Sequence, residues 1–266
     1  MLENSIKVCL KENCCIISLK GEKMPHFLIK KSDIAENKVI IKDKDLYKHI
    51  IKVFRAKIGE KILFLDEEEN QYETILSKIQ SDLFEAEIIK KYKSNRKLPL
   101  NIYVAQSVLN SDAQISAIQK ATELGVKGII PLHTDNCAVK ESVIKNKIDK
   151  WRKVVIESVK QCERADIPIV YDLSSINDTV KRFDCVIVFA EKYTDMNFSQ
   201  YIKTIKIDKS KSILVIIGPE GGFSEKEFEF FKKEKFPLIT LGNLIYRADT
   251  ALVAALTTVI NGVLNG

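Results

Sequence analysis

The hydrophobic positions of residues 24–95 fall into short runs that are typical of β-strands. Apolar and β-branched residues recur at 27–29, 38–41, 61–65, 72–76 and 84–89, and polar turns such as 66–70 separate them. Short strands at this spacing predict a small antiparallel barrel. One helical patch at 45–54 interrupts the strands. The polar and basic segment 90–97 comes next, and we expect a domain boundary there.

After residue 98 the pattern changes to alternating strands and helices. Expected strands lie at 100–105, 128–132, 184–190, 212–217 and 238–241, and expected helices at 113–124, 148–163, 224–235 and 250–264. This alternation indicates an α/β domain with a mostly parallel, buried sheet. The closing helix is apolar on more than one face, so we expect it to be buried or shared with a partner.

Composition narrows the class of protein. The 266 residues are 45% hydrophobic and 29% charged, as in soluble globular proteins. There is no run of about 18 apolar residues, so no membrane span is predicted. Residues 1–23 lack the long apolar stretch of a secretory signal. Six cysteines without a C-x-x-C pair, beside three histidines, favour reduced thiols in the cytoplasm over disulfides or a zinc site.

The charge balance bears on the kind of partner and on the candidate functional residues. A net charge of +6 fits a polyanionic partner without requiring one. Lysine accounts for 36 of the 42 basic residues, so each arginine is a candidate for a site that needs a planar, bidentate donor. The six arginines are Arg55, Arg96, Arg152, Arg164, Arg182 and Arg247.

The strongest chemical signal is a glycine-rich loop. The apolar strand 213–217 runs into Gly218-Pro219-Glu220-Gly221-Gly222, and a helix follows at once. Glycines let a ligand approach the backbone, and α/β folds bind ligands at the carboxyl ends of strands. A tight turn without a ligand is the alternative. The loop has neither the Gly-Lys-Ser/Thr of a P-loop nor the G-x-G-x-x-G of a dinucleotide fold, which disfavours both ligand classes.

The helix after this loop has a well-marked start. Ser224 suits the N-cap position, and Glu227 completes a capping box. Phe223 and Phe228 are placed as the hydrophobic staple around it.

A second glycine-bearing loop, 241–247, follows the next expected strand. Two such loops on consecutive strands can line one pocket from two sides, with Arg247 at its mouth. Asp249 or Thr250 is expected to cap the closing helix. An arginine beside a helix N-terminus opposes the positive end of the helix dipole, which favours a functional role for Arg247 over a merely superficial one.

A third group lies on the helix expected at 148–163 and just after it. Glu157, Gln161 and Arg164 are spaced to share one face, and Pro168 follows. A solvated polar stripe is the alternative interpretation, and the spacing alone does not separate the two.

Together these residues resemble the RsmE family, the small-subunit ribosomal RNA uridine-N3 methyltransferases of the SPOUT superfamily. The resemblance runs from about Met24 to the C-terminus. It rests on the segments 24–27, 48–55, 57–60, 119–126, 161–168, 218–224 and 241–247, in that order. There are two departures. The family usually has Glu where this chain has Asp249, and residues 1–23 have no counterpart.

The resemblance implies a fold and an activity. The fold is a SPOUT-type α/β domain at 98–266, with a trefoil knot, and a PUA-like RNA-binding barrel at 24–95, with 1–23 as an N-terminal extension. The implied protein is a cytoplasmic homodimer without metal. It uses S-adenosyl-L-methionine to methylate N3 of a uridine in 16S ribosomal RNA of the small ribosomal subunit. The alternatives are a SPOUT methyltransferase acting on a different RNA or atom, a non-catalytic RNA-binding ribosome assembly factor, and a nucleotide-binding regulator.

The resemblance also implies roles for individual residues. Those that bind the cofactor are Phe189, Ala190, Ile217, Gly218, Pro219, Glu220, Gly221, Gly222, Leu241, Gly242, Leu244, Ile245 and Ala251. Those that hold RNA are His49, Arg55, Lys91, Lys93, Lys97 and Gln161. Uridine N3 becomes nucleophilic when it loses its proton, and a cation beside the resulting anion lowers the barrier, so Arg247 or Arg164 is expected to be catalytic. No general base is evident, which leaves water or a carboxylate such as Glu123.

Overall fold

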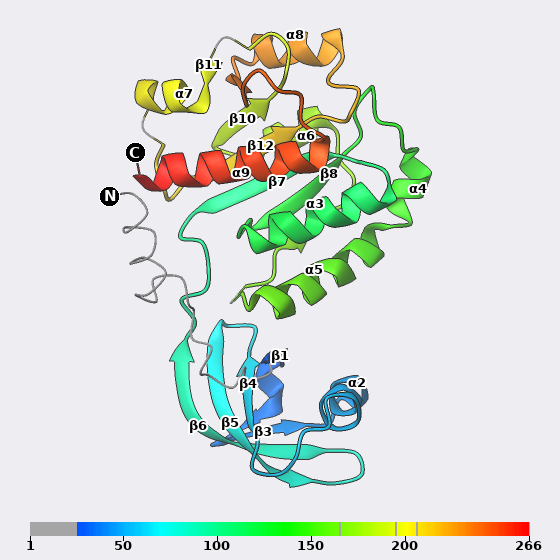
Figure 1. Cartoon of the computed structure of the whole chain (residues 1–266), viewed down its shortest axis with the longest axis vertical. Coiled ribbons are helices and arrows are strands. Elements are labelled where there is room, and N and C mark those ends of the chain that lie inside the picture. Colours follow the sequence, from blue (N-terminus) through cyan, green and yellow to red (C-terminus); the bar gives the residue numbers. More distant parts are fainter. Residues whose placement is uncertain (1–25, 165, 195, 206, 266) are drawn as a thin grey trace, which may run out of the picture. The chain divides into compact units, whose positions relative to one another are not determined.

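The computed structural model describes residues 26–164, 166–194, 196–205 and 207–265 (Figure 1). The described chain forms two compact units that divide between Lys93 and Ser94, inside the basic segment 90–97. Each unit has its own hydrophobic core. The expected N-terminal extension lies outside the described residues.

The N-terminal unit is a six-stranded sheet in the order β1-β4-β5-β6-β3-β2. Its strands are β1 (His26–Leu28), β2 (Ile34–Ala35), β3 (Lys38–Ile41), β4 (Lys61–Leu65), β5 (Asn70–Ile79) and β6 (Phe84–Lys93). The pairs are antiparallel, as predicted, except that β1 runs parallel to β4. Because β6 extends to Lys93, Lys91 and Lys93 lie on a strand rather than in a linker.

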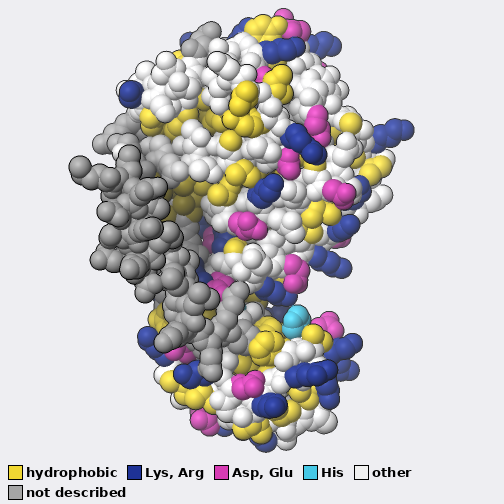
Figure 2. All heavy atoms as spheres, in the orientation of Figure 1, with side chains coloured by type: hydrophobic (Ala, Val, Ile, Leu, Met, Phe, Trp, Pro, Cys, Tyr) yellow, Lys and Arg dark blue, Asp and Glu magenta, His cyan; other side chains and the backbone are white. Residues whose placement is uncertain are grey.

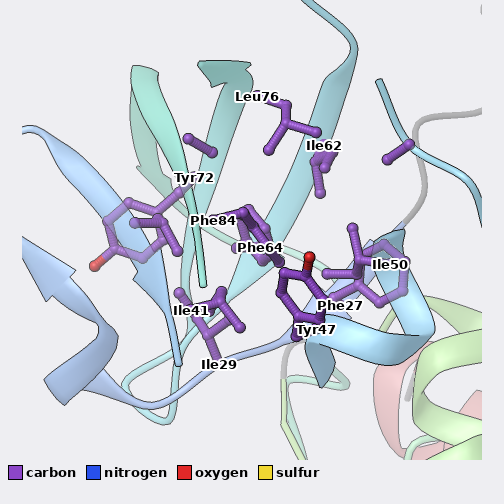
Figure 3. Packing of buried hydrophobic residues seen from close by; sticks show 13 residues of the cluster. Phe27, Ile29, Ile41, Tyr47, Ile50, Ile62, Phe64, Tyr72, Leu76 and Phe84 are labelled. Carbon is purple, nitrogen blue, oxygen red and sulfur yellow. The ribbon is translucent and has the colours of Figure 1, made fainter. Parts of the chain in front are cut away.

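The helix expected at 45–54 forms in two parts, α2 (Lys44–Tyr47) and the π-helix η2 (Lys48–Val53). A short 3-10 turn, η1 (Lys31–Asp33), precedes them. Ile50 of η2 enters the core beside the rings of Phe27, Phe64 and Phe84 (Figure 3). π-helical turns occur frequently at functional sites. One side of this helix is therefore buried and closes the core, and its other side faces solvent.

The C-terminal unit is built on a seven-stranded parallel sheet in the order β11-β13-β10-β12-β7-β8-β9. Its strands are β7 (Asn101–Ser107), β8 (Gly128–Leu132), β9 (Ile169–Val170), β10 (Cys185–Phe189), β11 (Met196–Asn197), β12 (Ser212–Ile217) and β13 (Leu238–Thr240). Its helices are α3 (Ser111–Glu123), α4 (Glu141–Lys145), α5 (Ile148–Cys162), α6 (Ile176–Val180), α7 (Phe198–Thr204), α8 (Glu225–Lys233) and α9 (Ala248–Asn265). The α/β prediction is confirmed. The short elements β9, β11, α4, α6 and α7 are additional to the expected ones.

Helices cover both faces of this sheet. Ala105, Ile130 and Leu214 point to one face, where they pack with Val180 of α6 and Phe231 of α8. On the other face, α9 packs against α3 and β12 (Figure 1). A sheet buried on both sides explains why its strands read as continuous apolar runs.

The closing helix α9 has the length and composition of a membrane span. Seven of its residues are nevertheless buried, among them Leu252, Leu256 and Val259. It contacts α3, α7 and β12, as a core helix does. Ala251 and Val253, on either flank of the buried face, remain half-buried.

Candidate cofactor pocket

Three neighbouring strands of the C-terminal unit end at one edge of the sheet. β13, β10 and β12 are adjacent and parallel, so their carboxyl ends meet there. The loops that leave these ends enclose a pocket of about 370 Å³. That volume is within the roughly 300–1,000 Å³ of small-molecule sites. The carboxyl edge of a parallel sheet is also where α/β folds bind ligands.

The structure brings together all thirteen residues predicted to bind the cofactor, and Arg247 lines the same pocket. The remaining lining residues are Glu191, Lys192, Phe223, Phe228, Thr240, Tyr246 and Ala248. Glu191 and Lys192 were not expected. They follow β10 as the glycine-rich loop follows β12, but their loop contains no glycine or other motif that marks it in the sequence.

The loop after β13 presents apolar side chains at the pocket wall. Leu244 is 72% exposed and Ile245 is 83% exposed, although both are large and hydrophobic. Gly242 has a φ of +114°, a conformation that glycine adopts without steric cost. Exposed aliphatic groups beside bare backbone suit a ligand that has a flat apolar part.

The glycine-rich loop is fixed by the helix that follows it. Ser224 and Glu227 form the predicted capping box at the start of α8. The rings of Phe223 and Phe228 meet edge to face, with centroids 5.9 Å apart. Both predictions for this junction are confirmed. Gly222 has a φ of +71°, which explains why glycine is needed at the end of the loop.

A segment distant in sequence forms hydrogen bonds with the same loop. Asn136, which follows β8, donates from Nδ2 to the carbonyl oxygens of Gly222 at 3.0 Å and Gly221 at 3.4 Å. Its neighbour Asp135 accepts a hydrogen bond from Ser224 Oγ at 2.5 Å and donates its backbone N–H to Glu227 at 3.1 Å. No local pattern marks these contacts, because the partners are 85 to 92 residues apart.

Arg247 lies directly before α9, at the edge of the pocket. Its side chain is exposed, and its guanidinium forms no hydrogen bond or ion pair with any residue that the structure describes. Its donors are therefore available to a bound group. The positive end of the α9 dipole lies beside it, which adds to the local positive potential.

The start of α9 differs from the prediction. The helix begins at Ala248, and the carbonyl oxygen of Arg247 accepts the first intrahelical hydrogen bond, from Ala251 N at 2.8 Å. Asp249 and Thr250 thus lie inside the first turn, and the expectation that one of them caps the helix is wrong.

Arg164 does not reach the pocket. The helix α5 ends where Glu163 takes a left-handed φ of +56°, and Arg164 then turns into the interior with 5% of its side chain exposed. Its guanidinium donates to the carbonyl oxygens of Thr122 at 2.7 Å and Val126 at 3.0 Å, and pairs with Asp166 at 3.0 Å. These contacts hold Arg164 in the interior, away from the pocket lining, and give it a structural role.

Asp166 completes this buried charge cluster. Burial alone would raise the pKa of its carboxyl group, but Lys127, whose ammonium lies 2.7 Å away, and Arg164 outweigh burial and lower the pKa. Gln161 and Glu157 stay on the exposed side of α5, where Glu157 pairs with Lys160 at 2.9 Å. Both residues are therefore open to solvent and separated from the buried Arg164.

The N-terminal unit carries a cationic surface with apolar members, which we name the η2 surface. It consists of the exposed residues His49, Lys52, Val53, Phe54, Arg55, Lys57 and Ile58. Phe54 is 48% exposed and meets Phe27 edge to face at 6.3 Å, as His49 does at 5.7 Å. Aromatic groups among cations are typical of surfaces that bind single-stranded nucleic acid.

The remaining residues predicted to hold RNA are exposed but dispersed. On β6, the ammonium of Lys91 lies over the ring of Tyr72, 5.4 Å from its centroid, and Lys93 donates to the carbonyl oxygen of Glu68. Lys97 lies in the C-terminal unit, as does Gln161. The predicted RNA residues therefore do not form one cluster within either unit.

A second cavity, of about 300 Å³, lies between α3 and α9. Its lining residues are Lys120, Glu123, Leu124, Thr250 and Val253. Glu123, the candidate base, is thus in this cavity rather than in the first pocket. Asp249 lies nearby, held by Lys120 at 3.6 Å.

Metal-binding chemistry has no counterpart in the part of the chain that the structure describes, where no group of three or more His, Cys, Asp or Glu is placed to hold an ion. Cys137, Cys162 and Cys185 are free thiols. The other three cysteines lie outside the described residues.

Comparison with known proteins agrees with the division into two units. The family model for an RNA methyltransferase domain matches residues 96–260, and that for an RNA methyltransferase PUA domain matches residues 41–89. The chain is 32% identical to the ribosomal RNA small subunit methyltransferase E of Buchnera aphidicola (subsp. Schizaphis graminum), over 83% of this chain and 89% of that protein. It is 29% identical to the Bacillus subtilis protein of the same name, over 79% and 85%.

Solved structures share the fold. The ribosomal RNA small subunit methyltransferase E of Neisseria gonorrhoeae, bound to S-adenosyl methionine, superposes with a TM-score of 0.77 at 24% identity, over 90% of this chain and 97% of that one. A Legionella pneumophila methyltransferase in complex with the same cofactor gives 0.77 at 22% identity, over the same shares. The matches to a PUA domain and to an RNA methyltransferase domain, with a relative that spans both units, make this chain a member of the RsmE family of RNA methyltransferases.

Proposed function

We propose that this protein transfers a methyl group from S-adenosyl-L-methionine to N3 of a uridine in 16S ribosomal RNA of the small ribosomal subunit. The observation that carries the proposal is the pocket at the carboxyl ends of β10, β12 and β13, which unites every residue expected to bind the cofactor. The names of the relatives support a ribosomal RNA substrate. An enzyme of this kind is expected in the cytoplasm, with its substrate.

The pocket fits the cofactor chemically. Leu241, Leu244 and Ile245 provide an apolar wall for the adenine, and the glycine-rich loop provides backbone groups for polar atoms. Glu191 and Glu220 add two exposed carboxylates, which complement a positively charged ligand. When bound, S-adenosyl-L-methionine supplies a methyl group already activated by the adjoining sulfonium.

The protein's own residues then have two tasks. The pocket loops hold donor and acceptor in line, which supplies much of the rate enhancement in a reaction with an activated donor. The Arg247 guanidinium, exposed and uncommitted, stabilises the uridine anion that forms when N3 loses its proton. The target base is reached unpaired or flipped out of its stack. The proton passes to water or to a carboxylate of the pocket, because Glu123 lies in the other cavity.

The N-terminal unit holds the RNA. The η2 surface offers Lys52, Arg55 and Lys57 to phosphates and the ring of Phe54 to a base. Phosphate contacts by Lys and Arg dominate affinity for nucleic acid, so this surface supplies binding rather than chemistry.

Two further features belong to the proposal. The half-buried Val253 of α9 and the cavity between α3 and α9 leave apolar surface for a second copy of the chain, as a homodimer requires. The trefoil knot is supported by the position of β13, which inserts between β10 and β11, two strands that precede it in the chain.

Mass-spectrometric mapping of modified uridines in ribosomal RNA, with and without the protein, tests the activity. Appearance of one N3-methyluridine in small-subunit RNA is the expected result. A methyl group on another RNA or atom would show that the substrate differs from the one proposed. Cofactor or nucleotide binding with no methyl transfer would favour an assembly factor or a regulator. Sedimentation at micromolar concentration tests the dimer.

A further inference from the structure

One part of the C-terminal unit carries a local surplus of positive charge. Residues 140–160 contain seven lysines and arginines against three acidic residues, a surplus of four, whereas the whole chain has a net charge of +6. These residues form α4 and α5 of the C-terminal unit. Lys and Arg side chains project on the side of the molecule where Figure 1 shows these helices (Figure 2).

The acidic groups of this segment are all neutralised within the protein. Glu141 pairs with Lys145 at 3.4 Å, Asp149 with Arg152 at 2.8 Å, and Glu157 with Lys160 at 2.9 Å. Four lysines are left over, and none of them forms an ion pair with any residue that the structure describes. They are Lys140, Lys147, Lys150 and Lys153. We name this set the α4–α5 ridge.

Two of the ridge lysines lie on the exposed side of α5. Lys150 and Lys153 are three residues apart, so they are neighbours on the helix surface, and both are exposed. Lys147 is half-buried at the start of the helix, whose buried side carries Trp151 and Val155. At 1.5 Å of rise per residue, the three lysines span about 9 Å of the helix axis.

Their placement is unfavourable for the protein alone. Lys147 occupies the N-cap of α5, and Lys150 lies in its first turn. The N-terminus of a helix carries the positive end of the dipole, so cations there raise the electrostatic energy of the free protein. A polyanion bound along the ridge removes this penalty.

The ridge begins close to the pocket. α4 follows the loop that leaves the carboxyl end of β8, at the same edge of the sheet where the pocket opens. Asn136 in that loop contacts Gly222 of the pocket wall at 3.0 Å. Lys140 follows four residues later, so the chain places it within about 14 Å of Asn136.

We infer that the α4–α5 ridge binds the phosphate backbone of the RNA substrate next to the nucleotide that enters the pocket. This inference rests on the proposed function. Three observations favour phosphates as the ligand, namely uncompensated lysines, the helix dipole that adds to their potential, and the continuity with the pocket edge. The one arginine of α5 is held between Asp149 and Asp172, at 2.8 and 2.9 Å. Recognition at the ridge is therefore by point charges and does not depend on base sequence.

The test compares two variants that lose the same charge. One is Lys147→Ala/Lys150→Ala/Lys153→Ala on the ridge, where alanine keeps the helix stable. The control is Lys203→Ala/Lys209→Ala/Lys211→Ala, whose exposed lysines precede β12 at the opposite edge of the sheet. Affinity of the full-length proteins for transcribed small-subunit ribosomal RNA is measured across salt concentrations. Binding of S-adenosyl-L-methionine is measured in parallel.

Each phosphate contact contributes about 0.7–0.9 to the slope of log affinity against log salt. The ridge variant is expected to lose roughly 2 from that slope, whereas the control keeps nearly all of it. Cofactor affinity should be unchanged in both. Equal losses in the two variants would mean that only net charge matters, and no loss in either would mean that the ridge is solvated. Both results overturn the inference.

Two further outcomes are informative. A loss that appears with assembled small subunits but not with naked RNA would assign the ridge to an acidic protein surface and overturn the inference. If the wild-type protein neither binds nor methylates RNA, the proposed function itself fails. If the wild type methylates and the ridge variant retains its salt slope, the ridge alone is rejected.

Discussion

The two units of this protein place their chemistry in different parts of the structure. In the C-terminal unit, the pocket is built from backbone and loops at the ends of buried strands, and few exposed side chains complete it. In the N-terminal unit, the η2 surface consists of exposed side chains on a helix whose other side closes the core. A site built from backbone can be recognised in the sequence, because it needs glycines and helix caps at fixed spacings. A binding surface is harder to recognise, because it consists of common residue types that form a site only when the fold brings them together.

The largest expected effect tests whether the C-terminal core is independent of the N-terminal one. Arg164→Ala removes one of the two cations that pair with Asp166, together with the donors to the carbonyl oxygens of Thr122 and Val126. Loss of a buried ion-pair partner typically costs about 3–5 kcal/mol of unfolding free energy. Denaturant unfolding should show this loss in the C-terminal unit only. Arg152→Ala, which breaks ion pairs at the surface, is the control and should change stability little. Equal stability of both variants would contradict the structural role of Arg164.

The same cluster has a pH signature. Because the folded-state pKa of Asp166 is lowered, its contribution to stability is fully present above its unfolded pKa of about 3.9 and is lost as pH falls below that value. Arg164→Ala should weaken this acid dependence.

The next effect separates catalysis from RNA binding. Arg247→Ala should slow single-turnover methylation by about 10²–10³-fold, as removal of one charge-stabilising donor does, with cofactor and RNA affinity largely kept. Arg55→Ala in the N-terminal unit should do the reverse, with weaker RNA binding and an unchanged rate at saturating RNA. A normal methylation rate in the Arg247 variant would contradict the assignment of catalysis to the C-terminal unit and of RNA binding to the N-terminal unit.

A smaller loss is expected at the pocket wall. In Gly221→Val, the new Cβ would lie 3.3 Å from the Cβ of Asn136 and crowd the contact between the two loops. Cofactor affinity should fall by more than about tenfold, or ~1.4 kcal/mol, while RNA affinity and melting temperature stay near those of the wild type. Calorimetry that finds wild-type affinity in the folded variant would exclude this loop as the cofactor site.

The smallest effect concerns the Asn136 contact itself. Asn136→Asp keeps the shape but directs a carboxylate at two carbonyl oxygens, so the hydrogen bonds to Gly221 and Gly222 are lost. We expect cofactor affinity to weaken by roughly 3–10-fold, as for one hydrogen bond, and to recover partly at low pH, where a protonated carboxyl group donates again. Asn177→Asp, the same change at an exposed position of α6, is the control. Equal affinities at neutral pH would show that Asn136 does not position the loop.

Much of the fold was predictable because its signals are local. The apolar runs of the parallel strands, the capping box at Ser224 and the staple of Phe223 and Phe228 all lie within a few residues of one another. The pocket loops follow from the same patterns, since parallel strands bring their carboxyl ends together. The order of the strands in the sheet, which depends on distant pairings, was not available from these signals.

The predictions that failed, and the contacts that were missed, depend on features that the local sequence pattern does not contain. The face of α5 was extrapolated two residues past the end of the helix. Glu163 takes a left-handed conformation there, so Arg164 is buried rather than aligned with Gln161. Asn136 contacts its partners across more than 80 residues, which spacing does not reveal. A helix start two residues earlier than expected placed Asp249 beside Lys120 instead of at the cap.

The order in which the chain is synthesised gives the position of β13 a further consequence. β13 lies between β10 and β11, although both are made some forty residues before it, as their positions 185–197 and 238–240 show. While the polypeptide is still emerging, these two strands have no neighbour to pair with on the side that β13 will occupy. All strands of the N-terminal unit are complete once Lys93 has been synthesised, so this unit can fold during translation. A nascent chain released too early would therefore carry a finished RNA-holding unit and no cofactor pocket.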